Sequence, residues 1–282
     1  MKMNDKKKSI DNITDFEYYQ KNGFSRIYSL HMCSQALNLA GEFKKVLQVK
    51  GIAPEPDKED IKGRLASLIE SGAESPVPYI ECRHLDNPLV LKLCNDQKIK
   101  DIIRQIYGDD ILLWRTTIVK KGIASTEFSW HQDFGGKYSP GEFEYGLEPP
   151  FFFTVCIAIT KADNSNGGLV FAPGIKKLLP GKPSNEGKNA TELIDMDKFK
   201  LGETVEINMK PGEFFMFSDR APHFSPPNKS SEERVYLFMR CTVPFVKIRN
   251  HFSNQKILIL SGEDKMGINN SIQLESYLEN IA

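Results

Sequence analysis

The spacing of apolar residues changes character after about one third of the chain. Up to residue 110, apolar side chains recur at three- and four-residue intervals, as on one face of a helix. Thr14 and Glu17 have the spacing of a capping box, and Asn22-Gly23 is typical of a helix end. We therefore expect helices over residues 14–23, 30–49, 61–70, 88–94 and 98–107.

Beyond residue 110, short segments rich in β-branched and aromatic residues are separated by clusters of Gly, Pro, Asn and Asp. Short strands that follow one another without intervening helices favour a sandwich or barrel over a parallel α/β sheet. The pattern predicts strands over residues 111–119, 151–160, 168–172, 204–209, 213–218 and 234–243.

We expect one domain over residues 1–282, with three successive parts. A helical part covers about 12–108, a β core covers about 110–245, and a tail of mixed structure covers 246–282, with a last helix over 271–281. Residues 174–203 form a long insertion rich in Lys, Gly and Asn, with a helical turn near 191–198. A segment of that length inside a domain is usually a functional lid or a mobile excursion.

Composition excludes several classes of protein. The 37 basic residues balance the 37 acidic ones, so nothing indicates a nucleic-acid partner. The N-terminus has no apolar signal-peptide core, and the apolar run 151–159 is too short to cross a bilayer. The five cysteines have neither an even count nor CxxC spacing, which argues against disulfides and zinc ribbons. A cytoplasmic protein with reduced thiols is the expectation.

Three residues have the pattern of an iron site. In an extended chain residues i and i+2 point to the same side, so His131 and Asp133 can reach one ion while Gln132 faces away. His223, 92 positions later, follows a predicted strand and can supply a third ligand. Two imidazoles and one carboxylate suit Fe(II) and leave up to three coordination positions open. An HxD pair alone occurs by chance in many proteins, so the later residues matter.

Arg234 lies eleven residues after His223 and begins a predicted strand. Alternation places Arg234, Tyr236, Phe238 and Arg240 on one face of that strand. A guanidinium group can grip the distal carboxylate of 2-oxoglutarate with two hydrogen bonds. Ser225, two residues after His223, is placed to add a hydroxyl donor. The alternative is a surface cation beside the acidic pair Glu232-Glu233, and the spacing from His223 favours the carboxylate clamp.

In these motifs the chain resembles the phytanoyl-CoA dioxygenase family, which includes bacterial small-molecule hydroxylases. The matching segments follow one another over about 105 residues, and they are Trp130-His131-Gln132-Asp133-Phe134, Asn166-Gly167-Gly168-Leu169, Ala172-Pro173-Gly174, Pro211-Gly212-Glu213 and His223-Phe224-Ser225 through Asn228 to Arg234. The chain departs from the family at Ile175-Lys176, where Ser-His is frequent, and at Cys156, where Trp is frequent.

The resemblance implies a mainly β fold with flanking helices and a double-stranded β-helix (jelly-roll, cupin-like) core. It implies Fe(II) held by His131, Asp133 and His223, and O2 as the oxidant. It also implies 2-oxoglutarate held by Arg234, with help from Ser225, Gln132 and Phe128. Related halogenases replace the carboxylate ligand by Ala or Gly, so Asp133 argues against halogenation. The implied reaction hydroxylates an unactivated C–H bond and releases succinate and CO2.

We expect a small polar substrate, such as an amino acid or a natural-product intermediate, free or tethered to a carrier. Candidate contact residues flank the ligand pair or share its strands, and they are Arg115, Lys120, Phe134 and Arg240. Lysines of the 174–203 insertion can close over an anionic substrate or form a solvated loop. The assembly is expected to be a monomer or a homodimer, without a membrane partner.

Two other functional classes are compatible with the motifs. One is a metal-binding cupin-like protein without 2-oxoglutarate chemistry, in which Arg234 is structural. The other is a non-catalytic binding protein that keeps the fold. The intact set of three ligands makes the oxygenase the preferred interpretation.

Overall fold

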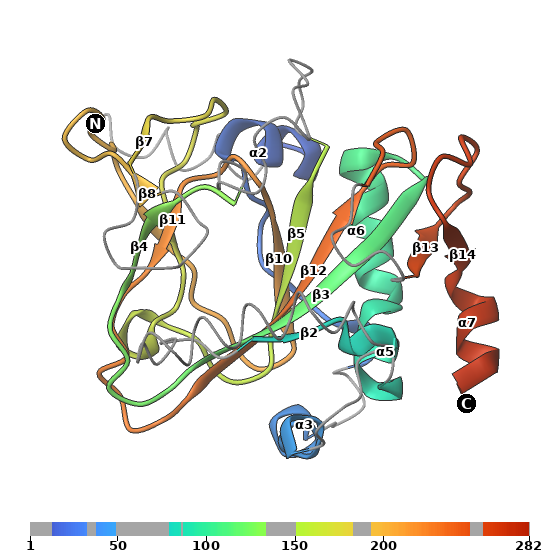
Figure 1. The fold of residues 1–282 in the computed structure, drawn as a ribbon. Helices are drawn as coiled ribbons and strands as arrows, with labels where there is room; N and C mark the ends of the chain where they lie inside the picture. Colours follow the sequence, from blue (N-terminus) through green and yellow to red (C-terminus); the bar gives the residue numbers. More distant parts are fainter. Residues whose placement is uncertain are drawn as a thin grey trace.

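Two β-sheets face each other at the centre of the molecule, and helices cover the outer side of the larger sheet (Figure 1). The computed structural model describes residues 13–32, 38–48, 79–85, 87–133, 151–182, 193–248 and 256–281. This two-sheet arrangement with flanking helices confirms the predicted jelly-roll class.

The larger sheet has eight strands in the order β1-β10-β5-β12-β3-β13-β14, with β2 also paired to β3. Its strands are β1 (Tyr28–Ser29), β2 (Tyr79–Glu81), β3 (Ile111–Lys121), β5 (Phe153–Ala158), β10 (Glu213–Ser218), β12 (Arg234–Thr242), β13 (Ile257–Ser261) and β14 (Ser271–Gln273). All pairs are antiparallel except β13 with β14.

The smaller sheet has six short strands in the order β7-β8-β4-β11-β6-β9. They are β4 (Phe128–His131), β6 (Val170–Phe171), β7 (Gly181–Lys182), β8 (Leu193–Ile194), β9 (Val205–Glu206) and β11 (His223–Ser225). β4 and β11 lie side by side near its middle, which brings residues 92 positions apart in the chain together.

The described helices are α2 (Asp15–Asn22), α3 (Leu39–Gln48), α5 (Pro88–Cys94), α6 (Gln97–Tyr107) and α7 (Leu274–Ile281). Two 3-10 turns cover Arg83–Leu85 and Asn164–Asn166. α2 begins with the predicted capping box of Thr14 and Glu17 and ends at Gly23, whose φ of 82° is left-handed. None of the described helices has the length and apolar character needed to cross a membrane.

Strand alternation divides the larger sheet into two faces with different partners. On β12, Val235, Leu237 and Met239 join the apolar core formed with α5 and α6. The intervening Tyr236 and Phe238 belong to a second core, between the sheets, which includes Phe171 of the smaller sheet. Side chains that alternate with the helix-facing core therefore point towards the space between the sheets.

Several predicted boundaries need correction. The helix expected over 30–49 is confined to α3 in the described residues, because the backbone N–H of Leu30 donates to the carbonyl of Gly212 and those of His31 and Met32 donate to the carboxylate of Asp96. β4 and β11 were not predicted as strands, and the last helix begins at Leu274 instead of residue 271, because β14 occupies Ser271–Gln273. The helix expected over 61–70 lies outside the described residues.

The insertion 174–203 returns to the sheet instead of forming only a loop. β7 pairs with β8, and β8 pairs with β4, where Leu193 lies opposite His131. A turn follows, in which Asp195 accepts backbone hydrogen bonds from residues 198 and 199.

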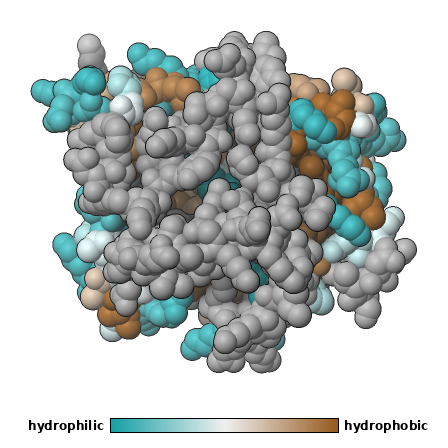
Figure 2. Space-filling model, viewed as in Figure 1, coloured by the Kyte–Doolittle hydropathy of each residue, from teal (hydrophilic) through white to brown (hydrophobic). Residues whose placement is uncertain are grey.

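On the described part of the face in Figure 2, hydrophobic residues gather along the right side, where Figure 1 places the upper ends of β3 and β12.

Candidate metal and co-substrate site

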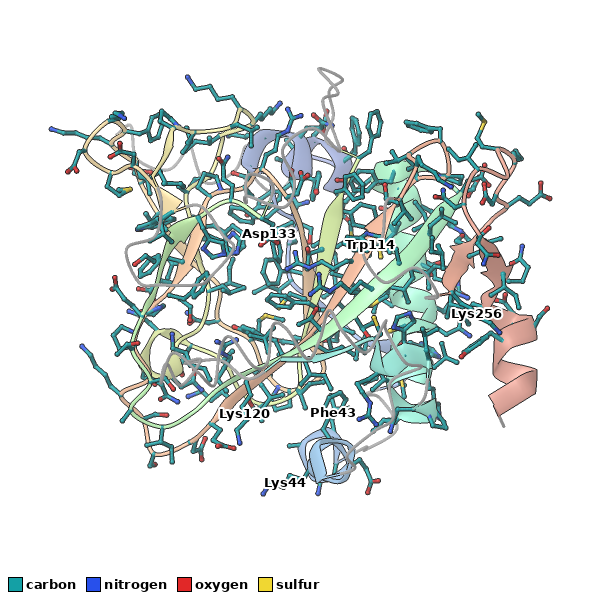
Figure 3. The ribbon with its side chains drawn as sticks, in the orientation of Figure 1. Phe43, Lys44, Trp114, Lys120, Asp133 and Lys256 are labelled. Atoms are coloured by element: carbon teal, nitrogen blue, oxygen red, sulfur yellow. The ribbon has the colours of Figure 1, made fainter. Side chains whose placement is uncertain are left out.

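His131, Asp133 and His223 lie together between the two sheets. One candidate ligand atom from each residue lies within 4.8 Å of the other two. Oδ1 of Asp133 lies 3.8 Å from Nε2 of His131 and 3.9 Å from Nε2 of His223. Figure 3 shows Asp133 on the β4 side of the space between the sheets. Two imidazole nitrogens and one carboxylate oxygen converging in this way fit an Fe(II) ion with an open face.

The β4–β11 pair positions both histidines. His131 ends β4, His223 begins β11, and the two are directly opposite in the antiparallel register. Nδ1 of His131 lies 2.9 Å from the carbonyl oxygen of Ser129, and Nδ1 of His223 lies 3.0 Å from that of Ala221. Because a carbonyl only accepts, each Nδ1 carries the proton and each Nε2 lone pair is left for a metal.

The protonation states of the three residues are those a metal requires. Burial, and then the neighbouring His223, lowers the pKa of His131 to about 3. Burial also lowers the pKa of His223. For Asp133, burial raises the pKa, but Arg240 and the two histidines outweigh it and hold the pKa well below its usual range. At neutral pH the imidazoles are therefore neutral and the carboxylate is ionised.

Arg240 fixes the orientation of the Asp133 carboxylate. Nη1 of Arg240 donates a short hydrogen bond to Oδ2 of Asp133 and another, of 2.6 Å, to Oγ1 of Thr154. Arg240 lies on the same face of β12 as Phe238, and its guanidinium group lies 5.4 Å from that ring. With Oδ2 engaged, Oδ1 is the oxygen that faces the two imidazoles.

Gln132 points away from its two neighbours, as alternation predicts. Its side-chain NH2 donates to the carbonyls of Lys177 (2.9 Å) and Arg220 (2.5 Å), and its oxygen accepts from the backbone N–H of Leu179 (2.8 Å). The amide thus ties the segment after β6 to the turn before β11. These contacts use both ends of the side-chain amide, so Gln132 supports the ligand pair instead of facing the co-substrate.

Arg234 is 2% exposed and lies at the start of β12, with its guanidinium group 4.2 Å from the ring centre of Tyr236. Ser225 is buried as well, and its hydroxyl donates a 2.8 Å hydrogen bond to the carbonyl of Gly167. Phe128, opposite Ser225 in the β4–β11 pair, packs edge-on against the His131 ring at 4.5 Å. Of the four predicted co-substrate residues, Ser225 and Phe128 thus lie on the histidine strands, and Arg234 lies opposite Lys121, which contacts Ser225.

Lys121 lies beside two of the predicted co-substrate residues, and the sequence reasoning did not select it. It is opposite Arg234 in the β3–β12 register and fully buried, and its ammonium group donates to Oγ (2.9 Å) and O (3.1 Å) of Ser225. Lys120, the predicted substrate contact, is on the other face of β3 and forms a 2.6 Å ion pair with Glu233. Figure 3 shows Lys120 far from Asp133. Strand alternation applied to β3, as it was to β12, would have selected Lys121.

The other predicted substrate residues have mixed outcomes. Arg115 is half-buried and lies directly opposite Arg240 in the β3–β12 pair, so both side chains are on the face towards the smaller sheet. Phe134 lies outside the described residues. Cys156, where the family often has Trp, is buried opposite Phe238 on that same face.

Asp219 is a second feature that sequence reasoning missed. It is 7% exposed, and burial raises its pKa to about 7, with the negative charge of Asp133 adding to the shift. An acidic residue in the turn before a candidate metal-binding histidine is visible in the sequence, but its burial is not.

Comparison with known proteins agrees with this geometry. The model of the phytanoyl-CoA dioxygenase (PhyH) family matches residues 28–236. Ectoine dioxygenase of Streptomyces anulatus is 24% identical over 186 residues, covering 64% of this chain and 58% of that protein. Methylphosphonate hydroxylase of Gimesia maris is 28% identical over 152 residues, covering 53% of this chain and 52% of that protein. The chain thus spans little more than half the length of these two relatives.

Among solved structures, CytC3 with Fe(II) and alpha-ketoglutarate superposes with a TM-score of 0.64 at 18% sequence identity, covering 92% of this chain and 91% of that one. At that identity the similarity concerns the fold. The family model, in contrast, spans well over half of the chain and includes all three candidate ligands and Arg234. The chain therefore belongs to the phytanoyl-CoA dioxygenase family.

Proposed function

We propose that the protein is an Fe(II)/2-oxoglutarate-dependent dioxygenase that hydroxylates a C–H bond of a small molecule, with release of succinate and CO2. One observation carries the proposal: a His-Asp-His cluster in the protonation state of a metal site lies in the same fold as a buried arginine eleven residues after its last histidine. Family membership supports it, because relatives in the family are named as dioxygenases and hydroxylases.

His131, Asp133 and His223 would hold the Fe(II), which when bound would supply the activation of O2 for oxidative decarboxylation of the keto acid. Because Oδ2 of Asp133 accepts a hydrogen bond from Arg240, Oδ1 would be the oxygen available to the ion. Arg234 binds the distal carboxylate of 2-oxoglutarate and so aims its keto-acid end at the metal. The apolar side chains between the sheets exclude water from this region.

The substrate class follows from the two arginines on the site-facing side of the larger sheet. Arg115 and Arg240 are directly opposite each other in the β3–β12 pair, and Asp133 already accepts a hydrogen bond from Arg240. Two guanidinium groups on this face favour a negatively charged substrate, because guanidinium donors match the geometry of carboxylate and phosphonate oxygens. We infer a substrate with a carboxylate or phosphonate group, free in solution. Methylphosphonate is an example of such an anion among the substrates that relatives are named for. Tethering to a carrier and the monomer or homodimer state remain predictions.

An anaerobic titration tests the activity. Fe(II) and then 2-oxoglutarate are added to the apoprotein, and the visible metal-to-ligand charge-transfer band is recorded. We expect the band in the wild type and its loss in Asp133→Ala and Arg234→Ala, with Lys120→Met as a surface control that keeps it. Absence of the band in folded, iron-loaded wild type would leave the metal-binding cupin-like protein as the better account.

The substrate class is tested separately. Succinate formation from 2-oxoglutarate is measured without a substrate and then with small carboxylates, phosphonates or matched neutral amides. The wild type and Arg115→Gln are compared. We expect the anions to stimulate succinate formation in the wild type. In Arg115→Gln the KM for these anions should rise about tenfold, since a hydrogen bond to a charged group contributes about 1.5–3 kcal/mol. Equal stimulation by the neutral amides would refute an anionic substrate.

A further inference from the structure

We propose that Lys121 is a second cation for the distal carboxylate of 2-oxoglutarate, beside Arg234, and that co-substrate binding is coupled to uptake of a proton by this lysine. The proposal rests on the proposed function, because it takes 2-oxoglutarate as the co-substrate. It concerns a residue of this chain that none of the motifs includes.

The position of Lys121 is the first observation. Lys121 ends β3 and Arg234 begins β12, and the two are directly opposite in the antiparallel register, so their side chains share one face. Lys121 is fully buried, and Arg234 is 2% exposed. Two cations removed from water on neighbouring strands repel each other, and such an arrangement is stabilised when an anion binds between them.

The hydrogen-bond inventory is the second observation. Within the described residues, both oxygen partners of the Lys121 ammonium group belong to Ser225, and neither is an anion. An ammonium group has three donors, so one remains for a ligand. Ser225 has one hydroxyl proton, and it is already donated to the carbonyl of Gly167. The remaining donor of Lys121 can therefore bind a carboxylate oxygen of the ligand. Ser225 contributes indirectly, because it holds the lysine in place.

The stem of Lys121 is fixed by its surroundings. A Cβ on Gly167 would lie 2.4 Å from Cδ and 2.9 Å from Cε of Lys121, so only glycine admits the lysine at this place. The side-chain amide of Asn228 donates to the carbonyls of Lys121 (3.3 Å) and Gly122 (3.0 Å), and to that of Glu232 (2.8 Å), two residues before Arg234. Asn228 thereby fastens the end of β3 to the start of β12.

The charged groups around Lys121 determine the direction of the pH dependence. Burial, and then Arg234 from β12, lowers the pKa of Lys121 to about 7, while Glu127, from the segment before β4, raises it in part. β11 contributes the neutral Ser225, and the turn after β5 contributes Gly167. Without co-substrate, Lys121 is thus largely neutral above pH 7. A carboxylate beside it favours the charged form, so binding takes up a proton, and the affinity falls as the pH rises above 7.

Calorimetry of 2-oxoglutarate binding to the Mn(II)-loaded protein tests this inference. Titrations at pH 6.5, 7.5 and 8.5, in buffers of different ionisation enthalpy, give the dissociation constant and the number of protons taken up. For the wild type we expect uptake of about half a proton at pH 7.5, where uptake should be largest, and a Kd that rises by up to about tenfold in total between pH 6.5 and pH 8.5. Lys121→Met should bind about tenfold more weakly at pH 6.5 and take up no proton.

Three controls keep the outcomes distinct. Lys120→Met, one residue away on the opposite face, should behave as the wild type. Lys121→Arg, which stays charged, should bind without proton uptake. A 2-oxo acid without the distal carboxylate, 2-oxobutyrate, should bind equally to the wild type and Lys121→Met.

The opposing outcomes separate this inference from the proposed function. If the wild type binds 2-oxoglutarate without proton uptake and Lys121→Met binds it equally well, the role of Lys121 is refuted while the dioxygenase proposal stands. If the wild type fails to bind 2-oxoglutarate, both are refuted. Should Lys121→Met fail to fold, the wild-type proton count and Lys121→Arg decide the question.

Discussion

Arg240 and Asp133 form an ion pair in which one carboxylate oxygen of Asp133 faces the arginine and the other faces the metal site. Oδ2 accepts from Arg240, and Oδ1 faces both imidazoles at 3.8 and 3.9 Å. The pair joins β12 of the larger sheet to the segment after β4 of the smaller one. The arginine is therefore placed to act on the metal through Asp133, as a positioning residue.

Replacing Arg240 should weaken metal binding before any substrate is present. Arg240→Gln removes the charge that orients Asp133, and outer-sphere replacements of this kind cost about 10- to 100-fold in metal affinity. We expect the Fe(II) dissociation constant to rise about tenfold, with partial rescue in Arg240→Lys. Arg104→Gln, on the surface of α6, serves as the control. An unchanged Fe(II) affinity in Arg240→Gln would limit the arginine to substrate binding.

Asp219 gives a pH-dependent prediction in the metal-free protein. Its pKa is about 7 when folded and near 3.8 when unfolded, so the folded state binds more protons between these values, and this carboxyl lowers the stability as the pH rises through that range. Asp219→Asn removes the titration. The free energy of unfolding of Asp219→Asn, relative to the wild type, should therefore increase by about 2 kcal/mol between pH 5 and pH 8.

Urea unfolding in the presence of a chelator measures this difference. Metal binding offsets the charge of Asp133, which contributes to the raised pKa, so the pH effect should shrink in the metal-loaded protein. A difference between Asp219→Asn and the wild type that is the same at both pH values would contradict the raised pKa.

The parts of the site that follow from strand alternation could be predicted from the sequence. Period-two spacing correctly placed Arg234 and Arg240 on one face of β12 and turned Gln132 away from the ligand pair. The same reasoning was not applied to β3, so Lys120 was chosen where Lys121 faces the site. A short strand such as β11, three residues long, has too few positions to show a period at all.

Other features depend on contacts between distant segments, which the sequence does not display. The pairing of β8 with β4 joins residues 193 and 131 across a long insertion. The burial of Asp219 and the ion pair of Asp133 with Arg240 likewise arise only when the two sheets come together. The Asn166-Gly167-Gly168 motif resembles the family in the sequence alone, but only the folded chain shows that Gly167 leaves room for the Lys121 side chain.

Gly167→Ala should disturb the co-substrate site and the fold together. Gly167 has a φ of 86°, and its new Cβ would also lie 3.0 Å from the carbonyl oxygen of Pro226. We expect a loss of about 1–3 kcal/mol in the free energy of unfolding and a weaker affinity for 2-oxoglutarate, because Lys121 must move. Gly202→Ala, where a Cβ meets nothing within 4 Å, is the matched control. Equal stability and equal 2-oxoglutarate affinity in the two variants would contradict this close packing.

Gln132→Met separates a supporting role from direct contact with the co-substrate. Methionine keeps the length of the side chain but leaves the N–H of Leu179 and the carbonyls of Lys177 and Arg220 without their present partner. Unsatisfied buried groups cost about 1–3 kcal/mol each, so we expect the free energy of unfolding to fall by at least about 2 kcal/mol. Gln97→Met, at an exposed position of α6, should have little effect. In the folded variant, 2-oxoglutarate affinity at saturating metal should stay within about threefold of the wild type, a change under 1 kcal/mol. A large loss of that affinity at unchanged stability would instead place Gln132 against the co-substrate.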